Sequence, residues 1–358
     1  MKILHVNYSL DYGGIETMLV NIVNEQVEYG HEIYILVLWN RINKNLVNRL
    51  DKRIRILPVN RPKGNWNPFY IIKANYFLIK IRPDIVHVHS AKLIDYIFLP
   101  WLRKKMCVTQ HRMCNGIGAD RLAKYTQIFA ISSSVKNDIK KNLNLESKVV
   151  YNGIQPNLIK CGNDKYSKED KKFHVVQVGR LYHQDKGQHI LVRAIKLIID
   201  SGINNICVDF IGDGPSKDFI QGLITELGVE SYFTFLGGKS PEYIYEHIHK
   251  YDIEVQPSLS EGFGLTAAEA MAAQIPVLVS DQDALLEVID NGKCGYYFKT
   301  GDYVDLSKIL MQIMRQKSNS ILLAAGKDRV SKLFDVKITA QNYLSNYKEL
   351  GKMEHNNT

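Results

Sequence analysis

Short apolar runs alternate along the chain with segments whose apolar residues recur at the period of a helix. Ile15, Met18, Leu19, Ile22 and Val23 form one such helical stripe. Because strands and helices alternate, we expect a parallel sheet with helices on both faces. The strands expected in the first half are Ile3–Asn7, Ile33–Leu38, Ile54–Val59, Ile85–His89, Cys107–Gln110, Ile128–Ile131 and Val149–Asn152.

The alternation stops at residues 155–172, which contain Pro156, Gly162 and a charged run from Lys168 to Lys172. It then restarts, and we predict a domain at 1–160, a linker at 161–172 and a second domain at 173–335. A last helix, Val336–Leu350, could pack on either domain. The strands expected in the second domain are His174–Val178, Val208–Ile211, Phe233–Leu236, Ile253–Gln256 and Pro276–Ser280.

Length and composition fit this organisation. A chain of 358 residues exceeds what one hydrophobic core usually organises, and 45% hydrophobic with 23% charged residues is ordinary for a globular protein. The net charge of +9 favours anionic partners without identifying them. We expect no nucleic-acid partner.

The cysteines and the N-terminal residues indicate the cellular compartment of the protein. Five cysteines without a C-x-x-C pair argue against a disulfide framework or a structural zinc site. We expect reduced thiols in a cytoplasmic protein. The first residues lack the basic and apolar regions of a signal peptide, and no apolar run approaches the length of a membrane span.

Ligands of doubly wound sheets bind beyond the carboxyl ends of the strands, so the residues there are the candidate site. Gly13 and Gly14 follow the first strand and precede a helix. They would let the backbone approach a diphosphate, or they would serve a turn that needs a positive φ.

In the second domain, Gly179 and Arg180 end the first strand, and Lys186 follows closely. A forked guanidinium beside a lysine suits a diphosphate; the alternative is two solvated cations on a loop. Gly212–Pro215 resembles part of a dinucleotide fingerprint but lacks the full G-x-G-x-x-G, and we interpret it as a turn that enters the next helix.

The most informative segment runs from Glu261 to Glu269. Phe263, Gly264 and Leu265 open a helix of small apolar residues that must be largely buried. In the functional interpretation the amides near Phe263–Leu265 bind a diphosphate, Glu261 binds sugar hydroxyls and Glu269 binds ribose hydroxyls. In the alternative, Glu269 pairs with a core arginine and Glu261 is a loop charge.

Two further features follow strand ends. His111, with Arg112, would orient a donor sugar or handle the proton of an acceptor, or else be structural. Asp281 and Asp283 form a D-x-D string of the kind that holds a metal in some sugar transferases. We interpret Asp283 as an N-cap and Asp281 as a turn residue, and we expect no metal.

At these residues the chain resembles family-4 retaining glycosyltransferases of the GT-B fold, over nearly its whole length. The most specific match is Glu261 and Glu269 around Gly262-Phe263-Gly264-Leu265. The other matching residues are Gly13-Gly14-Ile15-Glu16, His111, Ser132-Ser133, Asn152-Gly153-Ile154, Gly179-Arg180-Leu181, Lys186-Gly187, Gly212-Asp213-Gly214, Phe235-Leu236-Gly237 and Pro276-Val277.

The resemblance implies two Rossmann-like parallel-sheet domains facing across a cleft, with the helix 336–350 crossing back to the first. It implies that Arg180 and Lys186 hold the donor diphosphate, which Gly14 approaches from the first domain. Glu261 would bind the transferred sugar, Glu269 the ribose, and His111 would lie near the donor sugar. It further implies retention of anomeric configuration and no metal or cofactor.

One position departs from the family. Many members carry a Gly-Gly pair after the Pro-Val strand, where this chain has Asp283-Ala284. The departure affects the donor geometry and bears on the identity of the sugar.

The predicted function is transfer of a sugar from a nucleoside-diphosphate sugar to an acceptor hydroxyl in bacterial surface polysaccharide or glycolipid assembly. The alternatives are a nucleotide-sugar epimerase on the same fold and a catalytically silent nucleotide-sugar or glycan-binding module. A dinucleotide-dependent oxidoreductase fits less well, because no complete G-x-G-x-x-G follows a strand.

The acceptor side points to a glycan or a lipid-linked acceptor. The segments Pro68–Arg82 and Tyr96–Leu102 are apolar and aromatic, and the second runs into Arg103-Lys104-Lys105. Such segments suit an anionic membrane surface, which would make the protein peripheral on the inner face of the membrane. The alternative is two core helices with solvated ends.

Overall fold

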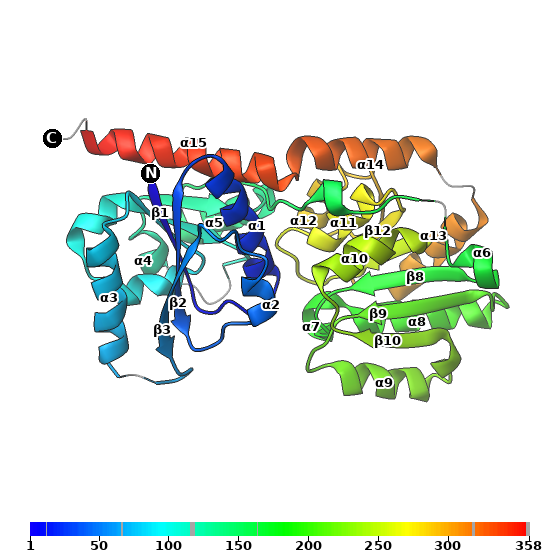
Figure 1. The fold of residues 1–358 in the computed structure, drawn as a ribbon. Coiled ribbons are helices and arrows are strands. Elements are labelled where there is room, and N and C mark those ends of the chain that lie inside the picture. The colour runs from blue at the N-terminus through cyan, green and yellow to red at the C-terminus, as the bar shows by residue number, and fades with distance from the viewer. Residues whose placement is uncertain (12, 66, 115–118, 163, 317–318, 356–358) are drawn as a thin grey trace. The chain divides into compact units, whose positions relative to one another are not determined.

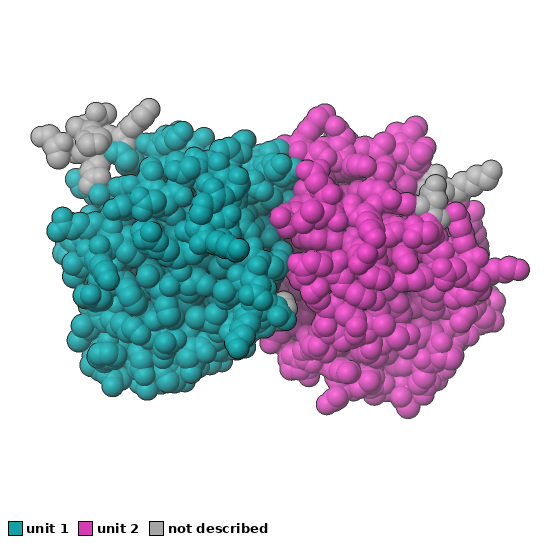
Figure 2. Space-filling view, viewed as in Figure 1, with its two compact units in different colours: residues 1–154, 335–358 teal, residues 155–334 magenta. Residues whose placement is uncertain are grey.

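The computed structural model describes residues 1–11, 13–65, 67–114, 119–162, 164–316 and 319–355. The chain forms two compact units (Figure 2). Unit 1 consists of Met1–Ile154 and Asp335–Thr358, and unit 2 of Gln155–Phe334.

The structure does not show a separate linker among the described residues of 161–172, where one was predicted. Residues 161–172, apart from residue 163 outside the described part, belong to unit 2 and contain the helix α6 (Ser167–Asp170). Lys165 Nζ donates to the carbonyls of His249 and Tyr251, each at 2.7 Å, and so ties this segment to unit 2. A polar, charged composition therefore reflected exposure here and not the absence of tertiary contacts.

Unit 1 contains a seven-stranded sheet in the order β3-β2-β1-β4-β5-β6-β7, and its strand pairs are parallel (Figure 1). The sheet confirms the predicted strands, except that the last is shorter than Val149–Asn152. The strands are β1 (Lys2–Asn7), β2 (Glu32–Trp39), β3 (Arg55–Arg61), β4 (Ile85–Val88), β5 (Met106–Gln110), β6 (Gln127–Ala130) and β7 (Lys148–Val149).

The helices of unit 1 cover this sheet. The apolar stripe predicted for α1 is confirmed in the middle of the helix. There, Met18, Leu19, Ile22 and Val23 are buried in the core with strand residues such as Ile3 and Ile33. The helices are α1 (Gly14–Glu28), α2 (Lys44–Val47), α3 (Phe69–Ile81), α4 (Ala119–Leu122), α5 (Ser133–Leu143) and α15 (Val336–His355), with 3-10 turns at Ala91–Tyr96 and Pro100–Lys105.

The last helix, α15, belongs to unit 1, as the resemblance implied. It lies beside α1, and Tyr343 and Tyr347 are fully buried in the core of unit 1 (Figure 1). The chain leaves unit 1 and re-enters it at one point, because Ile154 and Asp335 form a parallel bridge and Val336 N donates to Ile154 O at 2.8 Å.

The helix α3 is not a core helix, so that alternative is wrong for it. Only Ala74, Asn75 and Leu78 are buried. Its outer face exposes Phe69, Ile72, Tyr76 and Ile79, each at 50–63%. The second aromatic segment, Tyr96–Leu102, runs from the last residue of one 3-10 turn into the next instead of forming a helix. No helix of the described residues has the length and apolarity needed to cross a membrane.

Unit 2 contains a six-stranded sheet in the order β10-β9-β8-β11-β12-β13, again with parallel pairs. The prediction missed β13 because three residues directly after Gly295 give too short a pattern. The strands are β8 (Phe173–Val178), β9 (Ile206–Ile211), β10 (Phe233–Gly237), β11 (Ile253–Gln256), β12 (Val277–Ser280) and β13 (Tyr296–Phe298).

Helices flank this sheet and close the core formed by residues such as Val175, Ile195 and Phe210. They are α6, α7 (His183–Lys186), α8 (Gln188–Asp200), α9 (Lys217–Glu226), α10 (Pro241–His247), α11 (Leu265–Ala272), α12 (Asp283–Val288), α13 (Tyr303–Arg315) and α14 (Ser320–Leu333), with 3-10 turns at Pro156–Leu158, Glu230–Tyr232 and Ile248–Lys250.

Candidate active site

In unit 2 the loops after the neighbouring strands β8 and β11 are held together by backbone contacts. Leu259 N and Ser260 N donate to Asp185 O at 2.8 and 3.2 Å. Gly187 has a φ of +65°, and a Cβ there would lie 1.8 Å from Pro257 O, so only glycine permits this approach. The two loops therefore bring Lys186 and Glu261 together.

Glu261 collects polar contacts from three elements. Its Oε2 accepts from Lys186 Nζ at 2.6 Å, from Gln256 Nε2 at 2.8 Å and from Ser258 Oγ at 3.3 Å. Burial acts to raise the pKa of Glu261, but Lys186 and the hydrogen bonds outweigh it and lower the pKa. Glu261 is thus an ionised, oriented carboxylate, not a loose loop charge.

Glu269 lies in α11 among buried small residues, as the sequence predicted. Burial raises its pKa to about 8. Within the part of the chain that the structure describes, no arginine or lysine forms an ion pair with it, so the alternative of a core arginine partner is wrong. The half-buried carboxyl of Glu269 remains available to hydroxyl donors.

The start of α11 has a backbone conformation that requires glycine. Gly264 caps the helix with a φ of +107°, and a Cβ there would lie 2.6 Å from Leu285 Cδ2. The Phe263 side chain is 2% exposed and packs edge-on against Phe334. Phe263 can therefore offer only its backbone, and Leu265 begins the helix whose free amides attract anions.

Arg180 follows Gly179 at the end of β8 and is exposed. Its guanidinium lies 5.8 Å from the centre of the Tyr182 ring, and it forms no ion pair with any described residue. No direct contact joins it to Lys186 or Glu261 among those described. The structure therefore brings Lys186 and Glu261 together and leaves Arg180 as a free cation of the adjoining loop.

In unit 1 the glycine pair stands at the start of α1, with Gly13 as its cap and Gly14 as its first residue. Gly13 has a φ of 178°, which any residue adopts, so the alternative of a turn requiring a positive φ is wrong. A Cβ on Gly13 would instead lie 2.4 Å from Glu16 Oε2, in the space that the Glu16 carboxylate occupies.

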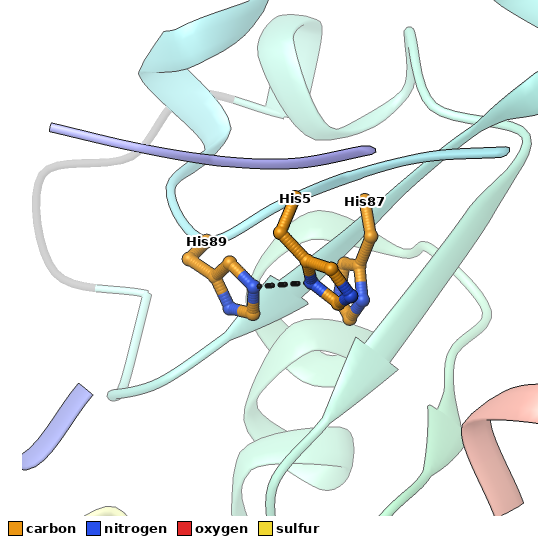
Figure 3. Close-up of side chains that lie close together, drawn as sticks. All are labelled: His5, His87 and His89. Atoms are coloured by element: carbon orange, nitrogen blue, oxygen red, sulfur yellow. Dashed lines mark hydrogen bonds between the residues drawn. The ribbon is translucent and has the colours of Figure 1, made fainter. Parts of the chain in front are cut away.

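His111 directly follows β5 and is half-buried. Its Nε2 lies 3.2 Å from Nδ1 of His89, and burial lowers the pKa of His111 to about 3. The ring is therefore neutral at physiological pH. His89 lies beside two more buried histidines, His5 and His87 (Figure 3).

Two family models match this chain, one in each unit. "Glycosyltransferase Family 4" matches residues 12–158, and "Glycosyl transferases group 1" matches residues 163–327. The chain is a family-4-type glycosyltransferase of the GT-B fold.

Relatives of this glycosyltransferase are distant in sequence. A Methanocaldococcus jannaschii glycosyltransferase is 27% identical over 316 residues, 77% of this chain and 79% of that protein. The capsular polysaccharide biosynthesis glycosyltransferase CapM of Staphylococcus aureus is 26% identical over 242 residues, 62% of this chain and 61% of that protein. The chain thus matches less than two thirds of CapM.

The fold is shared with solved structures. That of Anabaena HepE in complex with UDP and glucose has a TM-score of 0.81 at 20% identity, with 98% of this chain and 100% of that chain covered.

The two acidic residues of the D-x-D string, Asp281 and Asp283, lie after β12 and at the start of α12. Asp281 Oδ1 accepts from the backbone and hydroxyl of Thr300, at 2.8 and 2.5 Å, so it joins the end of β12 to the loop after β13. The N-cap prediction for Asp283 is wrong by one position: Gln282 is the cap and Asp283 the first residue of α12.

Sequence reasoning missed the residues that support the site. Gln256 and Ser258 hold Glu261, and Gln256 also accepts from Thr266 Oγ1 at 3.2 Å. Polar residues at the end of a buried strand were the available signal. The same signal, H-V-H at the end of β4, marks His87 and His89.

Glu254 was also missed. It lies in the middle of the sheet with both carboxyl oxygens unpaired among the described residues, and burial raises its pKa to about 8.

Proposed function

We propose that this glycosyltransferase moves a sugar from a nucleoside diphosphate to an acceptor hydroxyl with retention of anomeric configuration and without a metal. The observation that supports the donor class is the contact of Lys186 with Glu261, four residues before the start of α11. Lys186 and the first amides of α11 suit a diphosphate, and the Glu261 carboxylate suits sugar hydroxyls. HepE, which shares the fold, is described in complex with UDP and glucose.

In the proposed reaction the bond between the anomeric carbon and the diphosphate oxygen breaks, and its electron pair leaves with the diphosphate. Lys186, Arg180 and the amides of α11 stabilise that charge. The acceptor oxygen attacks the same face of the sugar, and its proton passes to the leaving phosphate oxygen. Glu261, an ionised carboxylate already bonded to Lys186, orients the transferred sugar, and Glu269 accepts from the ribose hydroxyls.

The deciding experiment is a thermal-shift screen with UDP, GDP and ADP, each free and as its sugar, because a ligand of the folded state raises Tm. We expect one nucleotide series to raise Tm and Arg180→Ala to weaken that shift. If no nucleoside diphosphate raised Tm, the proposal would be abandoned.

Product analysis separates the alternatives. With donor alone, an epimerase converts the sugar nucleotide, whereas a transferase requires an acceptor and a silent module binds without turnover. NMR of the product's anomeric proton tests retention. Activity in excess EDTA tests the metal, and a loss that manganese restores would favour a metal site at Asp281 and Asp283.

We further propose a role at the cytoplasmic membrane face, in bacterial surface polysaccharide or glycolipid assembly with a glycan or lipid-linked acceptor. CapM, a relative, is named for capsular polysaccharide biosynthesis. The supporting surface is the outer face of α3 together with Phe98 and Trp101, 57% and 43% exposed, which Asn75 links to α3 by accepting from Phe98 N at 3.2 Å.

Exposed cations border that surface, namely Lys80, Arg82, Arg103 and Lys104, and the chain has a net charge of +9. Apolar side chains bordered by cations suit an anionic membrane. We expect binding to phosphatidylglycerol vesicles at low salt, weakened at least tenfold by Ile72→Ser with Tyr76→Ser. The matched control is Ile321→Ser, since Ile321 is 82% exposed on α14 of unit 2. Equal binding of both variants would contradict the membrane role of α3.

A further inference from the structure

Four polar side chains of unit 1 form one continuous line of hydrogen bonds that ends at His111. Gln26 Oε1 lies 2.8 Å from His5 Nε2, His5 Nδ1 lies 3.1 Å from His89 Nε2, and His89 Nδ1 lies 3.2 Å from His111 Nε2. Figure 3 shows the contact between His5 and His89. The line runs from α1 through β1 and the end of β4 to the end of β5.

The neighbouring strands explain why the line exists. His5 and His87 are register partners in β1 and β4, and His89 lies two residues beyond His87, on the same face. Gln26, His5 and His89 are at most 3% exposed. An unpaired polar group there would cost free energy, so each ring nitrogen of His5 and His89 needs the partner that the line provides. Gln26 Nε2 has no hydrogen-bond partner among the described residues, and its Oε1 is the atom that faces His5.

The three rings are neutral. Burial lowers the pKa of His5 to about 4, that of His89 well below its usual value, and that of His111 to about 3. The neighbouring histidines lower the pKa of His89 further, and Arg112 lowers that of His111. A neutral imidazole has one donor and one acceptor nitrogen, so the position of the proton on each ring determines its position on the next ring.

The direction of the line follows from its buried end. Gln26 Oε1 can only accept, so His5 carries its proton on Nε2 and accepts through Nδ1. His89 must then donate through Nε2 to His5 and accept through Nδ1. His111 therefore donates through Nε2 to His89, which leaves Nδ1 without a proton.

We propose that Gln26, His5 and His89 are positioning residues that hold His111 in the Nε2–H tautomer and leave its Nδ1 as a fixed hydrogen-bond acceptor for a substrate hydroxyl. The part concerning the substrate rests on the proposed function, whereas the tautomer does not. His111 then recognises a hydroxyl as an uncharged acceptor and does not serve as a cation or an acid.

The same histidines raise the question of a metal, because nitrogen atoms of His5, His87 and His89 lie within 4.8 Å of one another. Both nitrogens of His87 are already hydrogen-bonded, Nδ1 to Tyr347 Oη and Nε2 to Thr109 Oγ1 at 2.7 Å. None of these groups is an acid that could offset the charge of a divalent cation. The described residues thus favour a hydrogen-bonded line, and a metal is an outcome of the test.

The first experiment measures the tautomers directly. In the full-length protein labelled with 15N-histidine and free of ligands, we expect NMR to find His5, His89 and His111 neutral with the proton on Nε2 from pH 5.5 to 8.5. A proton on Nδ1 of His111, a titration of His111 near pH 6.5, or one equivalent of metal in the purified protein would overturn the proposal. None of these readouts depends on activity, so they stand even if the proposed function fails.

Variants then test whether His89 fixes the tautomer of His111. His89→Phe removes the hydrogen bonds of this ring to His5 and His111, whereas His89→Gln keeps one donor and one acceptor. We expect His89→Phe to release the tautomer of His111 and lower kcat by on the order of 10- to 100-fold. His89→Gln should stay within about threefold of wild type.

The control is His87→Phe, which breaks the contacts with Tyr347 and Thr109 but leaves the line intact. It should lower Tm and leave the tautomer of His111 unchanged. If His87→Phe does not fold, Thr109→Val removes one of the same bonds more mildly. An unchanged tautomer and kcat in a folded His89→Phe protein would overturn the proposal.

Discussion

Glu261 and Glu269 belong to one segment of unit 2, yet their surroundings shift their pKa values in opposite directions. Glu261 faces Lys186 and three hydrogen-bond donors, which outweigh its burial. Glu269 experiences burial alone. At the residue scale, the site therefore holds one carboxyl whose pKa is lowered beside one whose pKa is raised to about 8.

Lys186→Ala should lower kcat by about 100-fold or more, because the cation that faces Glu261 and the diphosphate is lost. Steady-state kinetics with the donor found in the screen measures this effect. The matched control is Lys196→Ala, which removes an exposed pair with Asp200 one helical turn away. That control should leave kcat unchanged and Tm within about 2 °C. Equal kinetics for both variants would refute the role of Lys186.

Above about pH 7, stability should fall as pH rises toward 9, whereas below that pH the buried histidines, whose pKa values are lowered in the folded state, oppose this trend. The folded pKa values of Glu254 and Glu269, each about 8, lie above the unfolded value of 4.5, so the folded state holds more protons above about pH 7. Thermal unfolding between about pH 7 and pH 9 measures the slope. Glu269→Gln should flatten it and gain in Tm relative to wild type at pH 8. A slope unchanged in Glu269→Gln would contradict the raised pKa of this residue.

At the scale of elements, the start of α11 depends on a backbone conformation that only glycine adopts easily. Gly264 combines a φ of +107° with the Leu285 side chain close to its missing Cβ. The first amides of α11 follow Gly264 directly, and they are where the proposed diphosphate binds. The helix thus begins at a glycine whose conformational freedom costs chain entropy on folding.

Gly264→Ala should reduce the free energy of unfolding by about 1–3 kcal/mol, because an alanine is strained at this φ and meets Leu285. The matched control is Gly222→Ala in α9, where a Cβ would meet nothing within 4 Å. That change should stabilise by up to about 1 kcal/mol. Denaturant unfolding of both variants provides the comparison, and destabilisation by both would show that the argument from φ is wrong.

For the whole molecule, unit 2 is inserted into unit 1 at a single place. Ile154 and Asp335 are bridge partners, so the chain leaves and returns between adjacent residues. The helix α15 then supplies Tyr343, Leu344 and Tyr347 to the core of unit 1. Unit 1 is consequently incomplete without residues that follow unit 2 in the sequence.

Residues 1–154 joined by a short Gly-Ser linker to 335–355 should unfold cooperatively on heating, because the linker spans bridge partners. Residues 1–154 alone should lack a cooperative transition, since the core would lose the five buried side chains that α15 contributes, Val336, Tyr343, Leu344, Tyr347 and Leu350. Differential scanning calorimetry of the two chains tests this expectation. The same Tm for both would mean that α15 is dispensable.

Much of this architecture could be predicted from the sequence, because strand–helix alternation and strand-end glycines report local structure. Glu261, Glu269 and the start of α11 were found in this way. The boundary of the units was not, because the contacts of Lys165 with His249 and Tyr251 join distant parts of the chain. The line of hydrogen bonds from Gln26 to His111 was not predicted for the same reason, because it depends on the pairing of β1 with β4.

The position of α15 has a consequence for protein synthesis. A ribosome releases all of residues 155–334 before the helix that completes unit 1, and at common translation rates that interval is roughly 10–40 s. During this time the N-terminal half of the nascent chain keeps exposed the apolar surface that Tyr343 and Tyr347 will cover. The unit begun first is therefore finished last, and a chaperone that shields it would be needed most while unit 2 is already folding.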